Sequence, residues 1–432
     1  MKVELISPFT RSSYNTGNIF HIPQMSLALL AALTPAEIDV LIVDELIEAI
    51  DFERRVDLVG ITVNTRTVRR AYEIANEFRR RNIPVVLGGI HPSVAPHESI
   101  TCADAVVIGE AEEIWPQLLK DYKRGILKRF YYSKRPPSLR NWPFPRRGLL
   151  QKDKYDTVNL VQTSRGCPYH CDFCSVSVFY GKPVRLRPLN DVIAEITTLE
   201  GRNLLIVDDN IVGSLTYTKH LLVKLAQLEK RWIGQAPITI ANCEKMLKLL
   251  SRSGCQGLFV GFETNSIDNL IQSGKTQNIK NDYCESIKKL HDNGVSVLGS
   301  FIVGFDHDEK SCFEELLEFI NRSKIDVVDL GILTPYPGTT LYERLKAEKR
   351  LLDNKWWLKY DAEEVVYKPK LMTREELFQG WVLARKELYK LRPLMKRWTI
   401  GLWRRSFVGN IINWKANMGY RANATSRLNS NK

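Results

Sequence analysis

The sequence predicts an α/β protein with two consecutive parallel-sheet domains and a helical C-terminal region. Short runs of β-branched and other apolar residues alternate with helical patterns, first over residues 1–122 and again from residue 157 onward. These apolar runs lack the polar–apolar alternation of a half-exposed strand. Uninterrupted runs of this kind are typical of strands in a parallel sheet that helices cover on both faces.

The first domain, residues 1–122, is expected to be a doubly wound, flavodoxin-like sheet. Its strands are expected at residues 3–7, 40–43, 58–63, 85–87 and 105–108, and its helices at residues 24–33, 68–81 and 113–122. In such sheets ligands bind beyond the carboxyl ends of the strands. Those ends are rich in glycine here, which permits close approach of a ligand but also makes tight turns.

A basic, proline-rich linker is expected at residues 123–150, because Arg-Pro-Pro and Trp-Pro-Phe-Pro are too proline-dense for a helix or a central strand. Residues 151–345 should form a partial (β/α)6 barrel whose site opens at the strand C-termini. Its six strands are expected at residues 158–162, 204–207, 238–241, 258–262, 297–303 and 327–333. Residues 346–432 should be helical, with a final helix at residues 373–391 and a basic, tryptophan-rich tail.

Length and composition exclude several classes of protein. A chain of 432 residues has room for two or three domains, and its 44% hydrophobic and 26% charged content is neither collagenous nor disordered. The longest apolar run, residues 25–33, is far shorter than the roughly 20 residues that cross a bilayer. The first residues lack the pattern of a secretory signal peptide. The expected compartment is therefore the cytoplasm.

The net charge of +13 is concentrated in two segments. Residues 385–432 contain twelve Lys and Arg and one acid, and residues 123–147 contain nine and none. In the tail, Trp398, Trp403 and Trp414 lie among basic residues, a pattern that favours a helix lying on an anionic membrane surface. Two alternatives remain open, namely a tail packed on the barrel and a nucleic-acid-binding segment, of which nucleic acid is the less favoured partner.

Three of the eight cysteines, Cys167, Cys171 and Cys174, crowd into one loop directly after an expected strand. Soft thiolates at this spacing can converge on an iron–sulfur cluster or on zinc. A structural zinc site takes four ligands, and the fourth, His170, would have to turn inward between two others. Three ligands on a [4Fe–4S] cube instead leave one iron open to a substrate, which is the favoured interpretation. The other five cysteines are expected to be small buried hydrophobes.

The loop at residues 163–174, with Phe173 before the last cysteine, resembles the signature of radical S-adenosylmethionine enzymes. The six expected strands and the sequence Thr-Pro-Tyr-Pro-Gly-Thr at residues 334–339 are similar to the radical SAM barrel and to the cobalamin-associated branch of that family. The resemblance implies that the three cysteines hold a [4Fe–4S] cluster whose open iron chelates S-adenosylmethionine. Reduction by a donor such as flavodoxin or ferredoxin would then cleave it to methionine and a deoxyadenosyl radical.

The same resemblance implies that polar groups at other strand ends contact S-adenosylmethionine. The candidate residues for these contacts are Phe173, Asp208, Glu263 and Ser300. Glu263 follows the fourth expected strand and is the best candidate for a contact to the ribose or the amino group. For Asp208 a second interpretation fits almost as well, that of a helix cap or turn residue.

Residues 1–122 resemble the cobalamin-binding domain of the same enzymes, in a branch that includes hopanoid methylases and anaerobic tetrapyrrole cyclases. The implied cobalamin contacts are Asn64, Thr65, Gly88, Gly89, His91, Gly109, Glu110 and Glu112. One element departs from the pattern, because the D-x-H-x-x-G sequence is absent and Ile19 and Gln24 stand at its Asp and Gly positions around His21. Some members of this branch bind cobalamin without a histidine ligand. Cobalamin is therefore expected, with a scaffold domain as the alternative.

The function that this resemblance implies is cobalamin-dependent methylation of an unactivated carbon. One S-adenosylmethionine would supply the methyl group through methylcobalamin, and a second would supply the radical. A lipid-like or other apolar substrate would fit a membrane-associated tail. Two alternatives remain, namely a radical cyclase or rearrangement enzyme with the same cofactors and, from another class, a zinc-stabilised nucleic-acid-binding protein.

Overall fold

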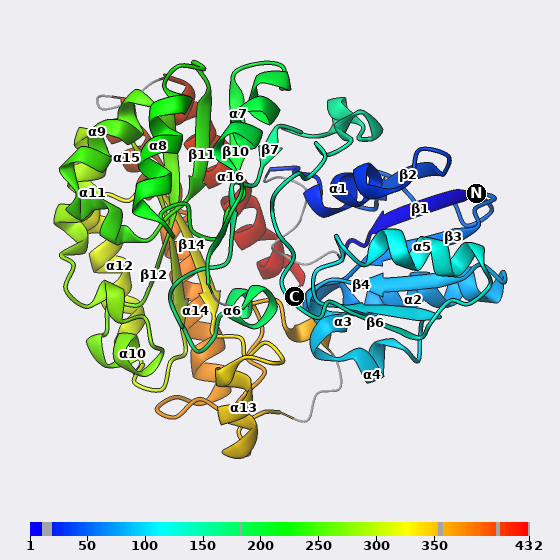
Figure 1. The fold of residues 1–432 in the computed structure, drawn as a ribbon. Coiled ribbons are helices and arrows are strands. Elements are labelled where there is room, and N and C mark those ends of the chain that lie inside the picture. Colours follow the sequence, from blue (N-terminus) through cyan, green and yellow to red (C-terminus); the bar gives the residue numbers. More distant parts are fainter. Residues whose placement is uncertain (11–19, 182, 353–356, 403–406, 431–432) are drawn as a thin grey trace.

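The computed structural model describes residues 1–10, 20–181, 183–352, 357–402 and 407–430. Two α/β bodies lie side by side (Figure 1), one built from the N-terminal segments and the other from the middle of the chain, with the C-terminal helices packed against the second. β1 (Lys2–Ser7) runs from the N-terminus at the far edge of the molecule toward the second body. The carboxyl end of the first sheet therefore faces the barrel.

The first body is a six-stranded parallel sheet in the order β2-β1-β3-β4-β5-β6. The other strands of this sheet are β2 (Asp39–Asp44), β3 (Leu58–Thr62), β4 (Val85–Gly88), β5 (Ala105–Ile108) and β6 (Phe130–Tyr132). Its helices are α1 (Met25–Leu33), α2 (Val68–Arg80), α3 (Ile90–Val94), α4 (Pro96–Ser99) and α5 (Trp115–Lys123), with a 3-10 turn η2 (Thr65–Thr67). The strand order confirms the doubly wound prediction.

Successive strand residues enter two separate hydrophobic cores, one on each face of this sheet. Leu5 packs with Leu27 of α1 and Leu118 of α5. The next residue in β1, Ile6, packs with Ile74 and Phe78 of α2 on the opposite face. Because both faces are buried, each strand is apolar along its length, which is the pattern that the sequence displays.

The expected linker at residues 123–150 is partly structured, which corrects the prediction. β6 (Phe130–Tyr132) lies inside it and extends the first sheet by pairing in parallel with β5. An edge strand needs a partner on one side only, and the prolines all lie after it, so proline density did not prevent it. Two 3-10 turns, η3 (Arg147–Leu149) and η4 (Lys152–Lys154), then lead to the barrel.

The second body is an open parallel sheet of six strands in the order β14-β13-β12-β11-β10-β7. These strands are β7 (Leu160–Val161), β10 (Asn203–Ile206), β11 (Arg231–Gln235), β12 (Cys255–Glu263), β13 (Ser296–Val303) and β14 (Val327–Ile332). The intervening helices are α6 (Ser175–Tyr180), α7 (Leu189–Thr198), α8 (Leu215–Leu225), α9 (Glu244–Arg252), α10 (Ile267–Gln272), α11 (Tyr283–Asp292) and α12 (Cys312–Ser323). The partial (β/α)6 barrel is confirmed.

One barrel strand was assigned to the wrong residues. The sequence predicts the third strand at residues 238–241, but the structure has the 3-10 turn η5 (Ile238–Asn242) there and places β11 at Arg231–Gln235. Both segments bury apolar side chains, including Trp232 and Ile238. The turn forms after Pro237, whose carbonyl oxygen accepts a hydrogen bond from Ile240 N at 3.2 Å. A short apolar run does not by itself distinguish a strand from a buried turn.

The C-terminal region is helical, as expected, and two further helices follow the helix predicted at residues 373–391. After α13 (Thr340–Ala347), which begins within the segment expected for the barrel, it contains η7 (Trp357–Lys359), α14 (Arg374–Leu388), α15 (Leu391–Leu402) and α16 (Phe407–Ser430). Trp381 of α14 donates its indole N–H to the carbonyl oxygen of Leu330 in β14 at 2.9 Å. Within the described part of the chain, no helix combines the length and the apolarity needed to cross a membrane.

A buried ion cluster fixes the start of the barrel to the segment that precedes it. Arg147 donates to the carboxylate of Glu195 in α7 and, through Nε, to the carbonyl oxygen of Val158 at 3.2 Å. Arg187 Nη1 lies 2.7 Å from the other oxygen of Glu195. All three side chains are at most 9% exposed. Buried charges are tolerated only when they are paired, so these residues depend on one another.

We expect Glu195→Gln to lower the free energy of unfolding by about 3 kcal/mol, because it leaves two buried guanidinium groups without a negative partner. Thermal unfolding followed by calorimetry measures the loss. Glu244→Gln is the matched control, since Glu244 pairs with Lys248 on the surface. Equal thermal stability of the two variants would contradict this account of the ion cluster.

Candidate functional site at the junction of the two sheets

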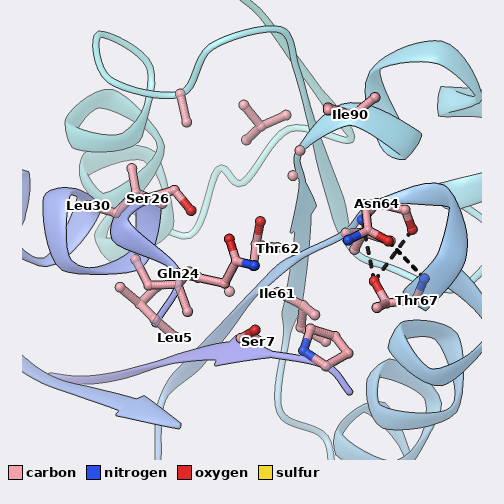
Figure 2. A pocket seen from close by; sticks show the side chains of 18 of the residues that line it. Leu5, Ser7, Gln24, Ser26, Leu30, Ile61, Thr62, Asn64, Thr67 and Ile90 are labelled. Atoms are coloured by element: carbon pink, nitrogen blue, oxygen red, sulfur yellow. Dashed lines mark hydrogen bonds between the residues drawn. The ribbon is translucent and has the colours of Figure 1, made fainter. Parts of the chain in front are cut away.

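A cavity of about 490 Å³ lies beyond the carboxyl ends of β1, β3, β4 and β5. Gln24, at the start of α1, extends across it toward Thr62 at the end of β3 (Figure 2). Asn64 and Thr67 form the opposite rim, where Asn64 Oδ1 accepts a hydrogen bond from Thr67 N at 3.0 Å. Polar groups therefore surround the entrance of the cavity.

The cavity reaches down between the sheet and the helices that cover it. Leu5, Val86, Val107 and Trp115 line this apolar part. Gly60 lies among them, and a Cβ there would come within 3.0 Å of Leu5 Cδ2 and 3.4 Å of the Trp115 ring. A larger residue would have to displace these neighbours, so glycine keeps the space open. The cavity therefore combines polar residues at its rim with an apolar inner part.

The wall opposite the first sheet is supplied by the barrel. Arg165 in β8 (Ser164–Arg165), together with Phe179 and Tyr180 of α6, lines the cavity from that side. Arg165 lies two residues before Cys167, and α6 begins directly after Cys174. The start of the cysteine loop and the end of the helix that follows it therefore form part of the cavity wall.

The guanidinium of Arg165 is buried between two carboxylates of the first domain. Its Nη1 lies 2.5 Å from Glu110 Oε2, and its Nη2 lies 2.6 Å from Glu112 Oε1. It also stacks over the ring of Trp142, with 4.4 Å from Cζ to the ring centroid. Burial alone would lower the pKa of Arg165, but the carboxylates outweigh it and raise the pKa above its usual value. The pairing joins the two domains at the cavity.

The cysteine loop is anchored to the end of β10 by consecutive residues. Asp208 is buried and accepts hydrogen bonds from Thr163 N at 2.6 Å and from Ser164 Oγ at 2.7 Å. Asp209 Oδ2 accepts one from Gly166 N at 3.0 Å. Burial raises the pKa of Asp209 to about 6, against the opposing effect of this hydrogen bond.

The three loop thiols are half-buried and differ in their surroundings. Asn210 Nδ2 donates to Cys167 Sγ at 3.5 Å. Burial raises the pKa of Cys171 to about 11, and the nearby ammonium of Lys275 opposes this shift. Burial also raises the pKa of Cys174. Among the described residues no three His, Cys, Asp or Glu side chains converge closely enough to hold a single ion.

This donor set fits an iron–sulfur cluster chemically. It offers three soft thiol ligands on one short loop, and a cluster lowers the pKa of the cysteines that bind it. Lys275 is half-buried near them and pairs with Glu263 at 2.5 Å, so a positive charge lies near the thiols. A nearby cation favours thiolates and compensates part of their negative charge.

The structure brings most of the expected cobalamin contacts to the cavity, but not all of them. The expected residues that line the cavity are Asn64, Gly88, Gly89, Gly109, Glu110 and Glu112. Thr65 and His91 are buried beneath the rim instead, where His91 Nδ1 lies 3.3 Å from Thr65 Oγ1. His21 is also absent from the described lining of the cavity. Which residues of these segments are buried and which line the cavity depends on the fold, and residue spacing in loops does not reveal it.

The expected S-adenosylmethionine contacts lie around the open end of the barrel. Ser300 is half-buried on β13, and Glu263 ends β12 with φ of 65°. Phe173 packs edge-on against Phe305 at 6.1 Å. The oxygens of Asp208 are occupied by the cysteine loop, which agrees with its second interpretation as a turn residue.

Sequence reasoning missed Arg165, Tyr180 and Lys275 as site residues. Arg165 stands directly before Gly166 and Cys167, and this position was the only available signal for it. Tyr180 and Lys275 carry no local signal, because α6 and the turn that follows α10 reach the site through the fold.

Three family matches cover most of the chain. The B12 binding domain matches residues 23–119, the Radical SAM superfamily matches residues 161–320, and a domain of unknown function, DUF4070, matches residues 339–402. The chain is 31% identical to bacteriochlorophyllide d C-8(2)-methyltransferase of Chlorobaculum tepidum, over 82% of each chain. It is also 31% identical to an uncharacterized methyltransferase of Pyrococcus horikoshii, over 87% of this chain and 90% of that one.

The chain belongs to the cobalamin-dependent radical S-adenosylmethionine methyltransferases. The fold agrees, because TsrM from Kitasatospora setae, solved with cobalamin and a [4Fe–4S] cluster, superposes with a TM-score of 0.72 over 99% of both chains at 16% identity. The chain is thus an enzyme of this methyltransferase family, whose cofactors are a [4Fe–4S] cluster, S-adenosylmethionine and cobalamin. None of these matches supports a zinc-stabilised nucleic-acid-binding protein.

We expect Arg165→Lys to weaken hydroxocobalamin binding by roughly tenfold, because an ammonium cannot reach both carboxylates and stack on Trp142 at once. Binding is measured by absorbance titration. Arg69→Lys is the control, since Arg69 pairs with Glu73 on the surface of α2. If both variants bound hydroxocobalamin as the unaltered protein does, the contacts of Arg165 with Glu110 and Glu112 would not be needed to keep the cavity in its binding form.

Proposed function

We propose that this enzyme transfers a methyl group to an unactivated carbon of an apolar substrate, with reductive cleavage of S-adenosylmethionine as the source of the radical. The observation that supports it is the shared wall between the cysteine loop and the cavity, formed by Arg165, Phe179 and Tyr180. When bound, the cluster supplies the electron that splits S-adenosylmethionine into methionine and a deoxyadenosyl radical, and cobalamin supplies a methyl carrier.

In this proposal Cys167, Cys171 and Cys174 are the cluster ligands. Three protein ligands leave one iron free for the amino and carboxylate groups of S-adenosylmethionine. Lys275 stabilises the thiolates, and Asn210 donates a hydrogen bond to the first of them. Hydrogen bonds to ligating sulfur adjust the reduction potential of a cluster. An acidic electron-transfer protein of the flavodoxin or ferredoxin class is the proposed donor of the single electron.

We assign Ser300, Glu263 and Phe173 to the nucleoside and methionine parts of S-adenosylmethionine. Ser300 offers a hydroxyl on the open side of β13, and Glu263 offers a carboxylate at the end of β12. Asp208 is assigned a positioning role instead, since Thr163 and Ser164 use both of its oxygens.

Cobalamin is assigned to the cavity of the first domain. Gly88, Gly89 and Gly109 allow the strand ends to approach its ring closely. Glu112 Oε2 is buried without a hydrogen-bond partner among the described residues, so it can accept one from an amide of the corrin side chains. The apolar slot beside Gly60 suits an extended arm of the cofactor.

The apolar class of the substrate rests on the names of relatives. Bacteriochlorophyllide d C-12(1)-methyltransferase of Chlorobaculum tepidum is 28% identical to this chain, and hopanoid C-2 methylase of Rhodopseudomonas palustris is 26% identical. Bacteriochlorophyllides and hopanoids are large, mainly apolar ring systems. A cyclase is the second candidate, supported by 24% identity to the anaerobic magnesium-protoporphyrin IX monomethyl ester cyclase of Cereibacter sphaeroides.

Cys171→Ala is expected to abolish both the cluster and the cleavage of S-adenosylmethionine, because two thiolates cannot hold the cube. Iron and sulfide are counted after anaerobic reconstitution, and deoxyadenosine is quantified by chromatography. Cys243→Ala, outside the loop, should retain about four irons per chain. Full iron content or deoxyadenosine formation in Cys171→Ala would refute the ligand assignment.

We further propose that α15 and α16 contact an anionic membrane surface. Leu391 and Met395 of α15 and Ile411 and Met418 of α16 are exposed. Trp398 and Trp414 pack together at 5.6 Å and join the two helices, whereas Trp403 lies outside the described residues. Arg392 and Lys396, which follow Leu391 and Met395 directly in α15, are also exposed. Exposed apolar and basic groups on one helix suit the interface of an anionic bilayer.

Met395→Glu is expected to weaken binding to phosphatidylglycerol vesicles by roughly tenfold, since it replaces an inserting apolar group with a charge that the lipid repels. Cosedimentation measures binding, and phosphatidylcholine vesicles should bind little. Leu215→Glu serves as control, because Leu215 is also an exposed apolar residue but lies on α8. If the unaltered protein did not sediment with phosphatidylglycerol vesicles, the membrane contact would be excluded.

A further inference from the structure

Trp357 connects the segment of unknown function to the N-terminal domain. It lies in η7, within residues 339–402, and packs against both the hydrophobic core of the barrel and the α2 core of the first sheet. Its indole N–H donates to Glu98 Oε1 at 2.9 Å and lies 3.1 Å from Oε2. Glu98 belongs to α4, so this contact joins segments 259 residues apart.

Trp357 lies in a polar cluster under the rim of the cavity. Its ring meets that of His91 edge-on at 5.2 Å. His91 Nε2 lies 3.4 Å from Glu98 Oε1, and its Nδ1 lies 3.3 Å from Thr65 Oγ1. Tyr72 donates its hydroxyl to Glu98 at 3.0 Å. We call Trp357, Glu98, His91 and Thr65 the clasp.

The clasp supports the loop that forms one rim of the cavity. Thr65 is buried and faces the clasp, whereas Asn64, Arg66 and Thr67 line the cavity. η7 contacts both η2 and α2. The loop is thus held from below by the C-terminal segment and presents its other side to the cavity.

The other end of the C-terminal segment is fixed to the barrel. Ile332 N, at the end of β14, donates to the carbonyl oxygen of Ala362 at 2.7 Å. Glu363 and Arg385 form a buried ion pair at 3.2 Å. Because the segment is anchored there, Trp357 is held at a constant position relative to the barrel and can fix the rim loop against it.

The ionisation state of Glu98 also supports a role for the clasp in holding the rim loop. Burial raises the pKa of Glu98, but the hydrogen bonds from His91, Trp357 and Tyr72 outweigh it and leave the pKa below its usual value. The carboxylate therefore stays ionised at neutral pH. An ionised acceptor makes stronger hydrogen bonds than a neutral one.

We propose that η7 (Trp357–Lys359) acts as a positioning element for cobalamin, in which Trp357 and Glu98 fix the loop at residues 64–67 in its ligand-binding form. This proposal rests on the assignment of cobalamin to the cavity. It gives Thr65 and His91 a supporting role in place of direct contact with the cofactor.

The test compares Trp357→Phe with Trp381→Phe. Each variant removes one indole N–H within residues 339–402, but Trp381 bonds to β14 and is remote from the rim loop. Trp357→Phe should weaken hydroxocobalamin binding about three- to tenfold and leave iron content unchanged. In cobalamin-free protein it should also accelerate hydrogen exchange of the amides of residues 63–68. Trp381→Phe should change neither hydroxocobalamin binding nor the exchange of these amides.

A second pair of variants tests the same contact from the acceptor side, in case Trp357→Phe does not fold. Glu98→Gln retains an oxygen acceptor for the indole N–H and should bind hydroxocobalamin better than Glu98→Ala. Equal hydrogen exchange and equal hydroxocobalamin binding in Trp357→Phe and Trp381→Phe would show that the clasp does not fix the rim loop. If the unaltered protein bound no hydroxocobalamin, the cavity assignment would fail, while the exchange comparison would still decide whether Trp357 holds the loop.

Discussion

The buried guanidinium of Arg165 is the constraint on which the site depends. A parallel sheet places its functional loops at one end, and here the loops of two such sheets meet in one space. A buried arginine needs carboxylate partners, and Glu110 and Glu112 provide them from the other domain. Because Arg165 is two residues from Cys167, its pairing with the first domain fixes the position of the cysteine loop relative to the cavity.

Further contacts restrict the remaining freedom between the two domains. Arg147 holds the connecting segment to the edge of the barrel through Glu195. On the other side Trp357 extends from the C-terminal region to Glu98 in the first domain. Attachment at separated points resists rotation of one domain against the other, which a single ion pair does not. Two cofactors that act in one reaction require this kind of fixed separation.

The fold and the cysteine loop were predictable because their signals are local. Continuous apolar runs identified β3 and β13 almost residue by residue, and the cysteine spacing marked the loop without any knowledge of its neighbours. Predictions failed where local patterns are ambiguous. Residues 238–241 are as apolar as a strand but form a turn. His91 lies in the expected segment, but it is buried and is not among the residues that line the cavity.

The sequence by itself determined the two parallel sheets, the spacing of the loop cysteines and the family resemblance, because periodicity and spacing are properties of neighbouring residues. Only the tertiary structure decided that Arg165 meets Glu110, that Tyr180 faces the cavity and that Trp357 reaches Glu98. Arg165 and Glu110 are 55 residues apart along the chain. Their contact depends on how two complete sheets pack, and no local pattern of side chains encodes that packing.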